Sequence, residues 1–375
     1  MQNAEIKRAV VRIKVIGVGG GGNSVIARIA RENVLDIDLV AVNTDAKQLQ
    51  NLPQPGVKIL QIGAGVTKGL GTGARHELGE TAALADIDKI KSMLTGADMV
   101  FITAGMGGGT GTGAAPVIAK AARDLGILSV GVVTVPFSFE GSRKKKIAEA
   151  GIEKMQMQMD ALIAVKNDNL LNLQQGRKLS LVDAFYAADG ILKQAIRCIT
   201  ELILTIGVIN VDFADVKSIF QQSASPDALI GIGESRDGAV EAVKRAITSP
   251  LIEKSLAGAR GIILNISGNE NLTLHEVNAA SKYIYENTHP DVNIILGTVV
   301  QNDFGDLVQA TIIATDFVDG IVVQEKAADP VPKEEALDVP KFLGRFTPHA
   351  DPPASGLKSF SGLKDEKYPD FRPKK

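Results

Sequence analysis

The chain has 375 residues, 45% of them hydrophobic, so it is long enough to form more than one hydrophobic core. Its 41 Lys and Arg nearly balance its 43 Asp and Glu, and no long basic stretch lies in the expected globular part, which argues against nucleic acid as a main partner. The single cysteine, Cys198, excludes an internal disulfide bond and a cysteine-rich zinc site.

No targeting or membrane-spanning segment is expected. Residues 1–7 lack the apolar run of a secretory signal, and no apolar stretch approaches the roughly 20 residues that cross a bilayer. We therefore expect a cytoplasmic protein without direct membrane insertion, which reaches a membrane only through a partner.

Short apolar runs alternate with helical patterns in the first half of the chain. Near-continuous apolar strands separated by helices indicate a parallel sheet covered on both faces. Ligands bind such sheets at the carboxyl ends of the strands, so the loops that follow the strands are the first place to look for a site. The predicted strands span residues 12–16, 39–42, 99–103, 129–135 and 161–165.

A long helix without proline is predicted over residues 180–205. Ser180 followed by Asp183 resembles a capping box at its start. Apolar residues recur three, four or seven positions apart and predict one continuous stripe, made of Leu181, Phe185, Leu192, Ile196, Ile199 and Ile203. This central helix is expected to pack against two bodies.

A smaller α/β domain is predicted after the central helix. Its strands span residues 228–231, 261–266, 293–300 and 309–315, and its helices span 238–247 and 274–286. Beyond residue 323 the composition shifts to Lys, Glu, Asp, Pro and Ser, which predicts a disordered tail. We therefore expect a first α/β domain (1–179), in which the candidate site lies, the central helix (180–206), a second α/β domain (207–323) and the tail (324–375).

The first glycine cluster, residues 17–22, follows a predicted strand and opens a helix. It fits the pattern G-x-G-x-x-G, in which glycines let backbone amides approach a phosphate at a helix N-terminus. The pattern suits any nucleotide, and a plain tight turn is the alternative.

A second glycine cluster, residues 105–113, again lies between a strand and a helix. Two such loops on neighbouring strands can surround an oligophosphate, with backbone amides and the hydroxyls of Thr110 and Thr112 as donors. No G-x-x-x-x-G-K-[ST] sequence occurs, so a P-loop with its phosphate-binding lysine is excluded.

The sequence GGGTGTG at residues 107–113 resembles the signature of the tubulin and FtsZ family. The resemblance is supported by NTD at 43–45, GLGTG at 69–73 and PFSFEG at 136–141, and it extends from about residue 13 to residue 316. It implies a tubulin-type fold and a GTPase that binds GTP and GDP. Mg²⁺ is the cation expected with a nucleoside triphosphate, bound mainly through the phosphates and not directly by the protein.

The resemblance also assigns nucleotide-binding residues. The phosphates and the neighbouring sugar are assigned to Gly20, Gly21, Gly22, Asn23, Ser24, Gly109, Thr110 and Gly111, and the motifs add Asp45, Gly71, Gly73, Gly105, Gly107 and Gly108. Guanine is assigned to Asn167, Phe185 and Asp189. A carboxylate such as Asp189 accepts from both the N1–H and the 2-amino group of guanine but repels the acceptors of adenine, so GTP is preferred over ATP.

Glu140 and the basic residues after it are assigned to the ribose and phosphate side. Four residues after Glu140 the family usually has Arg, whereas this sequence has Lys144, preceded by Arg143. Both remain candidates for the nucleotide contact, while Lys145 and Lys146 are expected at a solvated helix start.

An acidic motif follows the central helix, with Asn210, Asp212 and Asp215 as candidate catalytic residues. Its carboxylates are suited to orient an attacking water or to steady a cation, although Asp near a helix start is also a common N-cap. If Asp189 contacts guanine, residue 207 lies about 27 Å further along the helix, so these acids cannot reach their own nucleotide. We therefore expect hydrolysis to require a second copy stacked head to tail, a contact that repeats into a filament. The resemblance implies the same arrangement, in a division ring.

Residues 337–345 of the tail resemble the family's C-terminal peptide, which docks onto membrane-tethering and regulatory division proteins. The resemblance thus implies a location at the mid-cell division site. An apolar cluster in a polar segment that folds on binding fits this role, and an incidental apolar patch is the alternative. The peptide residues are Leu337, Asp338, Val339, Pro340, Phe342 and Leu343.

Two other functions stay open. A nicotinamide-dependent oxidoreductase would use residues 17–22 and an acidic ribose ligand after the second strand, where Asp45 lies, but it leaves residues 105–113 and 210–215 unexplained. A filament protein that binds nucleotide without hydrolysing it is disfavoured by Asp212 and Asp215, and phosphate release would distinguish it.

Overall fold

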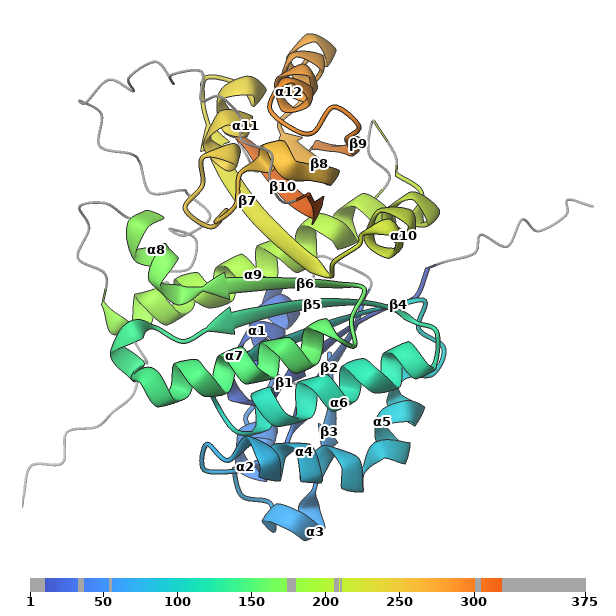
Figure 1. Ribbon diagram of the computed structural model, residues 1–375, viewed down its shortest axis with the longest axis vertical. Coiled ribbons are helices and arrows are strands. Elements are labelled where there is room, and N and C mark those ends of the chain that lie inside the picture. Colours follow the sequence, from blue (N-terminus) through green and yellow to red (C-terminus); the bar gives the residue numbers. More distant parts are fainter. Residues whose placement is uncertain are drawn as a thin grey trace, which may run out of the picture.

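The computed structural model describes residues 11–32, 37–53, 56–173, 180–205, 209, 211–300 and 305–318. Within them, ten strands form one sheet in the order β3-β2-β1-β4-β5-β6-β7-β10-β8-β9 (Figure 1). The strands are β1 (Ile13–Val18), β2 (Asp38–Asn43), β3 (Val57–Gln61), β4 (Met99–Gly105), β5 (Leu128–Val135), β6 (Ala161–Lys166), β7 (Asp227–Ser235), β8 (Ala259–Gly268), β9 (Asn293–Val300) and β10 (Val308–Phe317).

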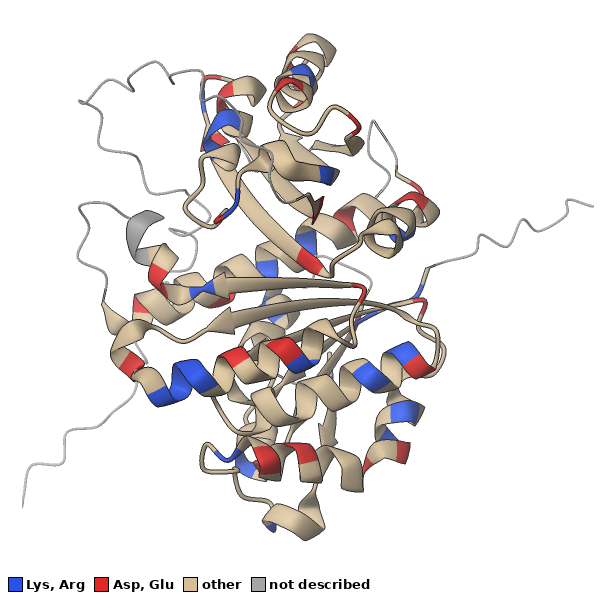
Figure 2. Cartoon of the chain, viewed as in Figure 1, with Lys and Arg blue, Asp and Glu red and all other residues tan. Residues whose placement is uncertain are grey.

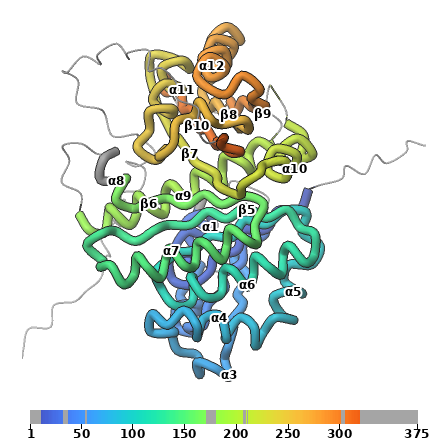
Figure 3. The backbone as a smooth tube through the Cα atoms, in the orientation of Figure 1, coloured from blue at the N-terminus to red at the C-terminus, as the bar shows by residue number. Residues whose placement is uncertain are grey.

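The first six strands are parallel and follow the order 3-2-1-4-5-6. This is the doubly wound arrangement, in which the strand order reverses between β1 and β4 and leaves a crevice at their carboxyl ends. Figure 3 shows α6 and α7 in front of this half of the sheet and α1 behind it. The helices of this half are α1 (Gly19–Glu32), α2 (Ala46–Gln50), α3 (Ala64–Thr67), α4 (His76–Ala85), α5 (Ile87–Leu94), α6 (Thr110–Asp124), α7 (Ser142–Gln156) and α8 (Asn167–Leu173).

The second half of the sheet is mixed. Strand β10 pairs antiparallel with β7 and β8, and β9 is a parallel edge strand beside β8. Helices α11 (Ala239–Ile247) and α12 (Leu274–Glu286) pack their apolar residues against one face of this half of the sheet. Helix α10 (Phe213–Gln222) lies at the right of this half in Figure 1. The two halves are joined by a short ladder between β6 and β7, with Leu162 opposite Asp227 and Ile163 opposite Ala228.

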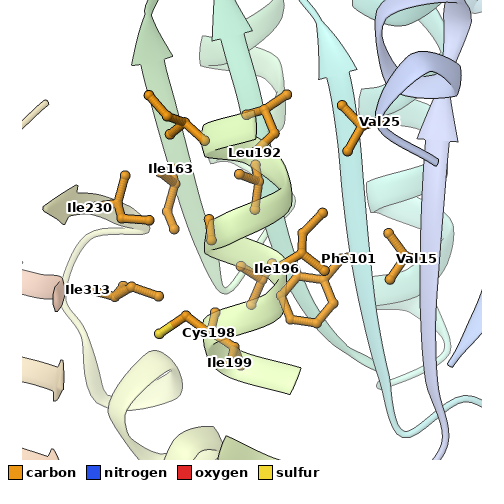
Figure 4. Packing of buried hydrophobic residues seen from close by; sticks show 14 of the residues in the cluster. Val15, Val25, Phe101, Ile163, Leu192, Ile196, Cys198, Ile199, Ile230 and Ile313 are labelled. Atoms are coloured by element: carbon orange, nitrogen blue, oxygen red, sulfur yellow. The ribbon is translucent and has the colours of Figure 1, made fainter. Parts of the chain in front are cut away.

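Helix α9 (Leu181–Leu204) connects the two halves. Its first amides are capped by Ser180, whose hydroxyl accepts from the amide of Asp183 at 3.1 Å. Figure 4 shows why the helix is so deeply buried, because its apolar side chains lie between residues of both halves of the sheet. Those labelled are Leu192, Ile196, Cys198 and Ile199 of α9, Val15, Val25, Phe101 and Ile163 of the first half, and Ile230 and Ile313 of the second.

The α/β fold class, with its mostly parallel sheet, is confirmed, but two details differ from the sequence prediction. The short strand β3 was not predicted, because it has only five residues and two of them, Lys58 and Ile59, are exposed at the sheet edge. The predicted stripe of the central helix is buried only from Leu192 to Ile199, since Ile203 is half-buried and Leu181 and Phe185 are 60% and 40% exposed. The predicted tail (324–375) lies outside the described residues. No helix in the described part of the chain is long and apolar enough to cross a membrane.

Candidate functional site

Two glycine loops meet at the crevice between β1 and β4. The first glycine loop (residues 17–24) joins β1 to α1, and the second glycine loop (residues 105–113) joins β4 to α6. A methyl group added at Gly19 would lie 2.8 Å from the amide nitrogen of Gly111, and one added at Gly21 would lie 3.1 Å from Gly105. Gly19 also has a φ of +69°, which disfavours any side chain there. The loops therefore touch directly, and only glycine permits this approach.

The N-termini of α1 and α6 carry the anion-binding capacity of these loops. The first amides of a helix lack partners within the helix and carry its partial positive charge. Neither helix has an acidic residue in its first turn to neutralise that charge. The predicted phosphate ligands Gly20, Gly21 and Gly22 form the first turn of α1, and Gly109, Thr110 and Gly111 begin α6. Of the remaining loop residues, Gly105 ends β4 and Gly107 and Gly108 follow it.

Asn23 and Ser24 bind the loop backbone through their side chains. In the amide orientation that satisfies its surroundings, Asn23 donates to the carbonyl of Gly17 at 2.8 Å and accepts from the side chain of Asn43 at 3.0 Å. Asn23 is 4% exposed. The hydroxyl of Ser24 donates to the carbonyl of Gly20 at 3.2 Å. These side chains shape the first glycine loop, while their backbone remains at the site.

The two threonines of the second loop are likewise engaged. The Thr110 and Thr44 hydroxyl oxygens are 2.9 Å apart, and the hydroxyl of Thr112 accepts from the amide of Gly107 at 2.9 Å. Thr112 is 1% exposed, so the structure does not favour it as the phosphate donor that the sequence suggested. Thr44 was not among the predicted residues, although it lies in the NTD motif.

Two further loops border the crevice. Asp45 caps α2, accepting from the amide of Gln48 at 3.1 Å, and a methyl group added at Gly71 would lie 3.8 Å from its carboxylate. Gly71 and Gly73 are exposed, and Thr72 between them is buried close to Gly109. The structure thus brings Asp45, Gly71 and Gly73 beside the second glycine loop.

Glu140 lies in the loop that leads from β5 into α7. Its carboxylate accepts from the amide of Phe137 at 3.0 Å and pairs with Lys144 at 2.9 Å. Arg143 is exposed and makes no ion pair with any described residue, so of the two candidates Arg143 and Lys144 it is the one free to reach a ligand. Figure 2 shows the basic residues gathered over the first turns of α7. Asp168, which the sequence did not single out, anchors this loop by accepting from the amide of Ser138 at 2.9 Å.

The three predicted guanine residues come from α8 and α9. Asn167 begins α8 and is 4% exposed, and its Oδ1 has no hydrogen-bond partner among the described residues. A buried acceptor of this kind is costly unless a donor reaches it, so it fits a ligand. Phe185 on α9 presents its ring at 5.4 Å, edge to face, to Phe137.

Asp189 lies one turn of α9 beyond Phe185 and is mostly buried. Burial raises the pKa of its carboxyl to about 6, while the charge and hydrogen bond of Arg28 oppose that rise. Arg28 on α1 donates from Nε to Oδ2 of Asp189 at 3.1 Å. Sequence reasoning missed Arg28, because its role depends on how α1 packs against α9.

The candidate catalytic acids lie at the opposite end of α9. Asp212 and Asp215 are exposed, and Asp212 caps α10 by accepting from the amide of Ala214 at 3.2 Å. The N-cap role is therefore present, and it leaves one carboxylate oxygen of Asp212 without that bond. In Figure 1 the carboxyl ends of β5 and β6 lie at the left and α10 lies at the right. Asn210 lies outside the described residues, as do Leu337, Asp338, Val339, Pro340, Phe342 and Leu343.

A cavity of about 300 Å³ adjoins Asp215. It lies between α10 and the edge strand β9 and is lined by Val211, Asp215, Ser218, Asn293, Ile294, Ile295 and Leu296. No group of three or more His, Cys, Asp or Glu side chains arranged to hold a metal occurs among the described residues.

Comparisons with known proteins agree with this geometry. Residues 12–175 match the Tubulin/FtsZ family, GTPase domain, and residues 227–318 match the FtsZ family, C-terminal domain. The strand order is shared with dinucleotide-binding folds and does not separate a GTPase from an oxidoreductase, whereas these matches do not favour the oxidoreductase.

Solved structures extend the likeness over most of the chain. A point mutant of FtsZ from M. jannaschii is 38% identical with a TM-score of 0.78, covering 82% of this chain and 92% of that chain. The empty FtsZ dimer from M. jannaschii is 37% identical with a TM-score of 0.78, covering 88% and 96%. CetZ2 from Haloferax volcanii, a GTPγS-bound protofilament, shares the fold at 21% identity and a TM-score of 0.67, covering 90% and 97%. The chain belongs to the tubulin/FtsZ family of GTPases.

Proposed function

We propose that this GTPase polymerises head to tail, and that each active site is completed by the acidic residues of the adjacent subunit. The nucleotide loops of one copy would meet the Asp212 and Asp215 end of the next copy. Such a contact uses two different surfaces, so it repeats without closing and produces a linear filament.

The separation of the two ends of α9 is the observation that carries the proposal. Asp189 and Leu204 are fifteen residues apart on one continuous helix, which corresponds to about 22 Å. Asp212 lies eight residues after Leu204 in the sequence, at the end of the helix away from the glycine loops. A carboxylate at that distance cannot orient water at a phosphate bound by its own chain.

Apolar residues at the two ends support the contact. At the nucleotide end, Leu70, Phe139 and Leu181 are between 60% and 68% exposed. At the other end, half-buried Val211, Ile294 and Leu296 line the cavity beside α10. Exposed apolar side chains on one surface and an apolar cavity on the other suit a contact between two copies. The M. jannaschii FtsZ relative was itself solved as a dimer.

The proposed chemistry divides between the two subunits. Amides at the N-termini of α1 and α6 would hold the phosphates, and Arg143 would reach the ribose and phosphate side. Asn167, Phe185 and Asp189 would hold guanine, with the unpartnered Oδ1 of Asn167 accepting from the base. Mg²⁺ would be bound mainly by phosphate oxygens and would neutralise their charge. The adjacent subunit's acids would orient the attacking water.

Sedimentation with phosphate release in the same tubes tests the proposal. We expect the protein to pellet with GTP and not with GDP or ATP, because guanine recognition and the γ-phosphate are both required. Turnover per molecule should rise steeply above a threshold protein concentration, since the complete site exists only between subunits.

The control variant for the threshold measurement is Leu274→Ala. It removes a side chain of α12 that is 79% exposed and belongs to neither proposed surface. It should leave the threshold unchanged. A turnover per molecule that stays constant on dilution would show that one chain is a complete catalyst and would refute the shared site.

A role in a division ring at mid-cell, in the cytoplasm, is part of the proposal. It rests on the FtsZ family membership, together with the tail peptide (337–345) as the site for membrane-tethering and regulatory partners. Deleting residues 324–375 should abolish ring localisation of a fluorescent fusion while leaving GTP turnover intact. Loss of turnover on the same deletion would contradict this separation of roles.

A further inference from the structure

Arg28 connects two helices at the base-binding end of the site. It lies on α1, beyond the glycine loop, and its side chain reaches α9. Its Nε is 3.1 Å from Oδ2 of Asp189, and both side chains are 18% exposed. Its guanidinium also lies over the ring of Tyr186, 4.0 Å from the ring centre. Arg28 is thus held by a charge on one side and an aromatic face on the other.

We propose that Arg28 is a positioning residue for guanine selection, which fixes the orientation of the Asp189 carboxylate and keeps it an acceptor on both oxygens. The inference rests on the proposed assignment of Asp189 to guanine. It adds Arg28 as a residue that does not itself contact the nucleotide but acts through Asp189, which does.

The geometry leaves the carboxylate available to a base. Within the part of the chain that the structure describes, Arg28 is the residue that donates to Asp189, and it does so at Oδ2. Oδ1 and the second lone pair of Oδ2 remain able to accept from the two donors of guanine. Because the Tyr186 ring restricts the guanidinium plane, the carboxylate is held in one orientation before the base arrives.

The surroundings of Asp189 make this support necessary. Burial raises the pKa of Asp189 to about 6, and Arg28 is the charged group that opposes the rise. On the neighbouring elements, Asp168 of α8 is bonded to Ser138, Arg31 of α1 is exposed, and Lys193 of α9 has interactions of its own. Without Arg28 the pKa would rise further, toward neutral pH.

Protonation would change what the carboxyl recognises. An ionised carboxylate only accepts hydrogen bonds and suits the N1–H and 2-amino donors of guanine. A protonated carboxyl donates through its O–H, which suits the acceptor N1 of adenine instead. Arg28 therefore favours guanine over adenine by keeping Asp189 in its ionised form at physiological pH.

The test measures GDP and ADP binding to the full chain between pH 6.5 and 8.5. Arg28→Met keeps the length of the side chain and removes the charge, Arg28→Lys restores the charge, and Arg31→Met is the exposed control on the same helix. We expect the GDP affinity of Arg28→Met to be within a fewfold of wild type at pH 8.5 and about tenfold weaker at pH 6.5, since each unit of pKa shift is a factor of ten. Arg28→Lys should recover most of the loss at pH 6.5.

The outcomes separate positioning from simple support of the fold. A loss of affinity in Arg28→Met that is equal at all pH values, or no loss at all, would overturn the proposal. Should Arg28→Met fail to fold, Tyr186→Leu, which keeps the charge but removes the aromatic face, should reduce the preference for GDP over ADP, and an unchanged preference would overturn the proposal. Unaltered GDP binding in Asp189→Asn would instead refute the assignment of Asp189 to guanine.

Discussion

Several polar side chains of the site form hydrogen bonds within the protein and not only with a ligand. Asn23, Thr112 and Asp212 all bind backbone atoms of their own loops or helices. Such bonds satisfy amides and carbonyls that would otherwise lie unpaired, and they fix loops that have few side chains of their own. A residue's place in a motif therefore does not by itself distinguish a ligand contact from a structural one.

Asp212 allows the two roles to be separated. Asparagine caps a helix as well as aspartate does but carries no charge, so Asp212→Asn should keep thermal stability and GTP binding while turnover falls by roughly 100-fold. Asp212→Ala should lose turnover similarly and also about 1 kcal/mol of unfolding free energy with the cap. Steady-state phosphate release and urea unfolding measure both quantities. If Asp212→Asn hydrolysed GTP at the normal rate, the carboxylate of Asp212 would have no role beyond capping α10.

At the scale of elements, the second glycine loop depends on the packing of α4 against α6. A methyl group added at Gly113 would lie 2.0 Å from the carbonyl oxygen of His76, and one at Gly79 would lie 2.4 Å from the carbonyl oxygen of Gly109. The helix backbones thus approach each other without side chains between them, and this contact holds the first turn of α6 in place.

Gly113→Ala should therefore separate these helices. We expect a loss of about 1–3 kcal/mol in unfolding free energy from overpacking, together with weaker GDP binding because the first turn of α6 moves. Gly65→Ala is the matched control, since Gly65 lies in α3 with open space around it and alanine favours the helix, so its stability should rise by about 0.4–1 kcal/mol. Urea unfolding and GDP titration compare the two variants. Equal effects would contradict the packing argument.

The elements that the sequence predicted well are those with long, regular patterns. The bounds of α12 and β9 agree residue by residue with the prediction, and α9 ends within a residue or so of it. The edge strand β3 was missed because it is short and partly exposed, and the exposed start of the α9 stripe was missed because periodicity does not reveal where a partner surface ends.

The site was predicted unevenly for a similar reason. Gly20, Gly109 and the other loop glycines stand out in the sequence, and the structure brings the two loops together. The contacts of Arg28 with Asp189 and of Asp168 with Ser138 join segments far apart in the chain, so no local sequence pattern predicts them. The use of Asn23 and Thr112 in loop structure is likewise visible only in three dimensions.

At the scale of the whole molecule, the two halves are joined more strongly by α9 than by the sheet. The ladder between β6 and β7 has two residue pairs, whereas one apolar cluster runs from Val15 through Ile196 to Ile313. Burial of that cluster is lost if either half separates from the helix. The molecule is thus expected to behave as one cooperative unit despite its two-part appearance.

Urea unfolding of the nucleotide-free protein tests this expectation. The chain has no tryptophan, so one can be introduced at Phe139 in the first half or at Tyr285 in the second, which are 62% and 53% exposed. The two fluorescence transitions should coincide, because α9 cannot leave one half alone without exposing core residues. Distinct midpoints for the two probes would show that the halves unfold independently.

The continuous helix α9 also fixes a distance in the proposed filament. In the filament proposed above, the interval between successive nucleotides equals the distance from one subunit's base contacts to its own acidic pair. The part of that interval from Asp189 to Leu204 is one continuous helical segment of about 22 Å, whose length cannot stretch without breaking hydrogen bonds. The periodicity of the polymer would therefore be set by the number of residues in a single helix.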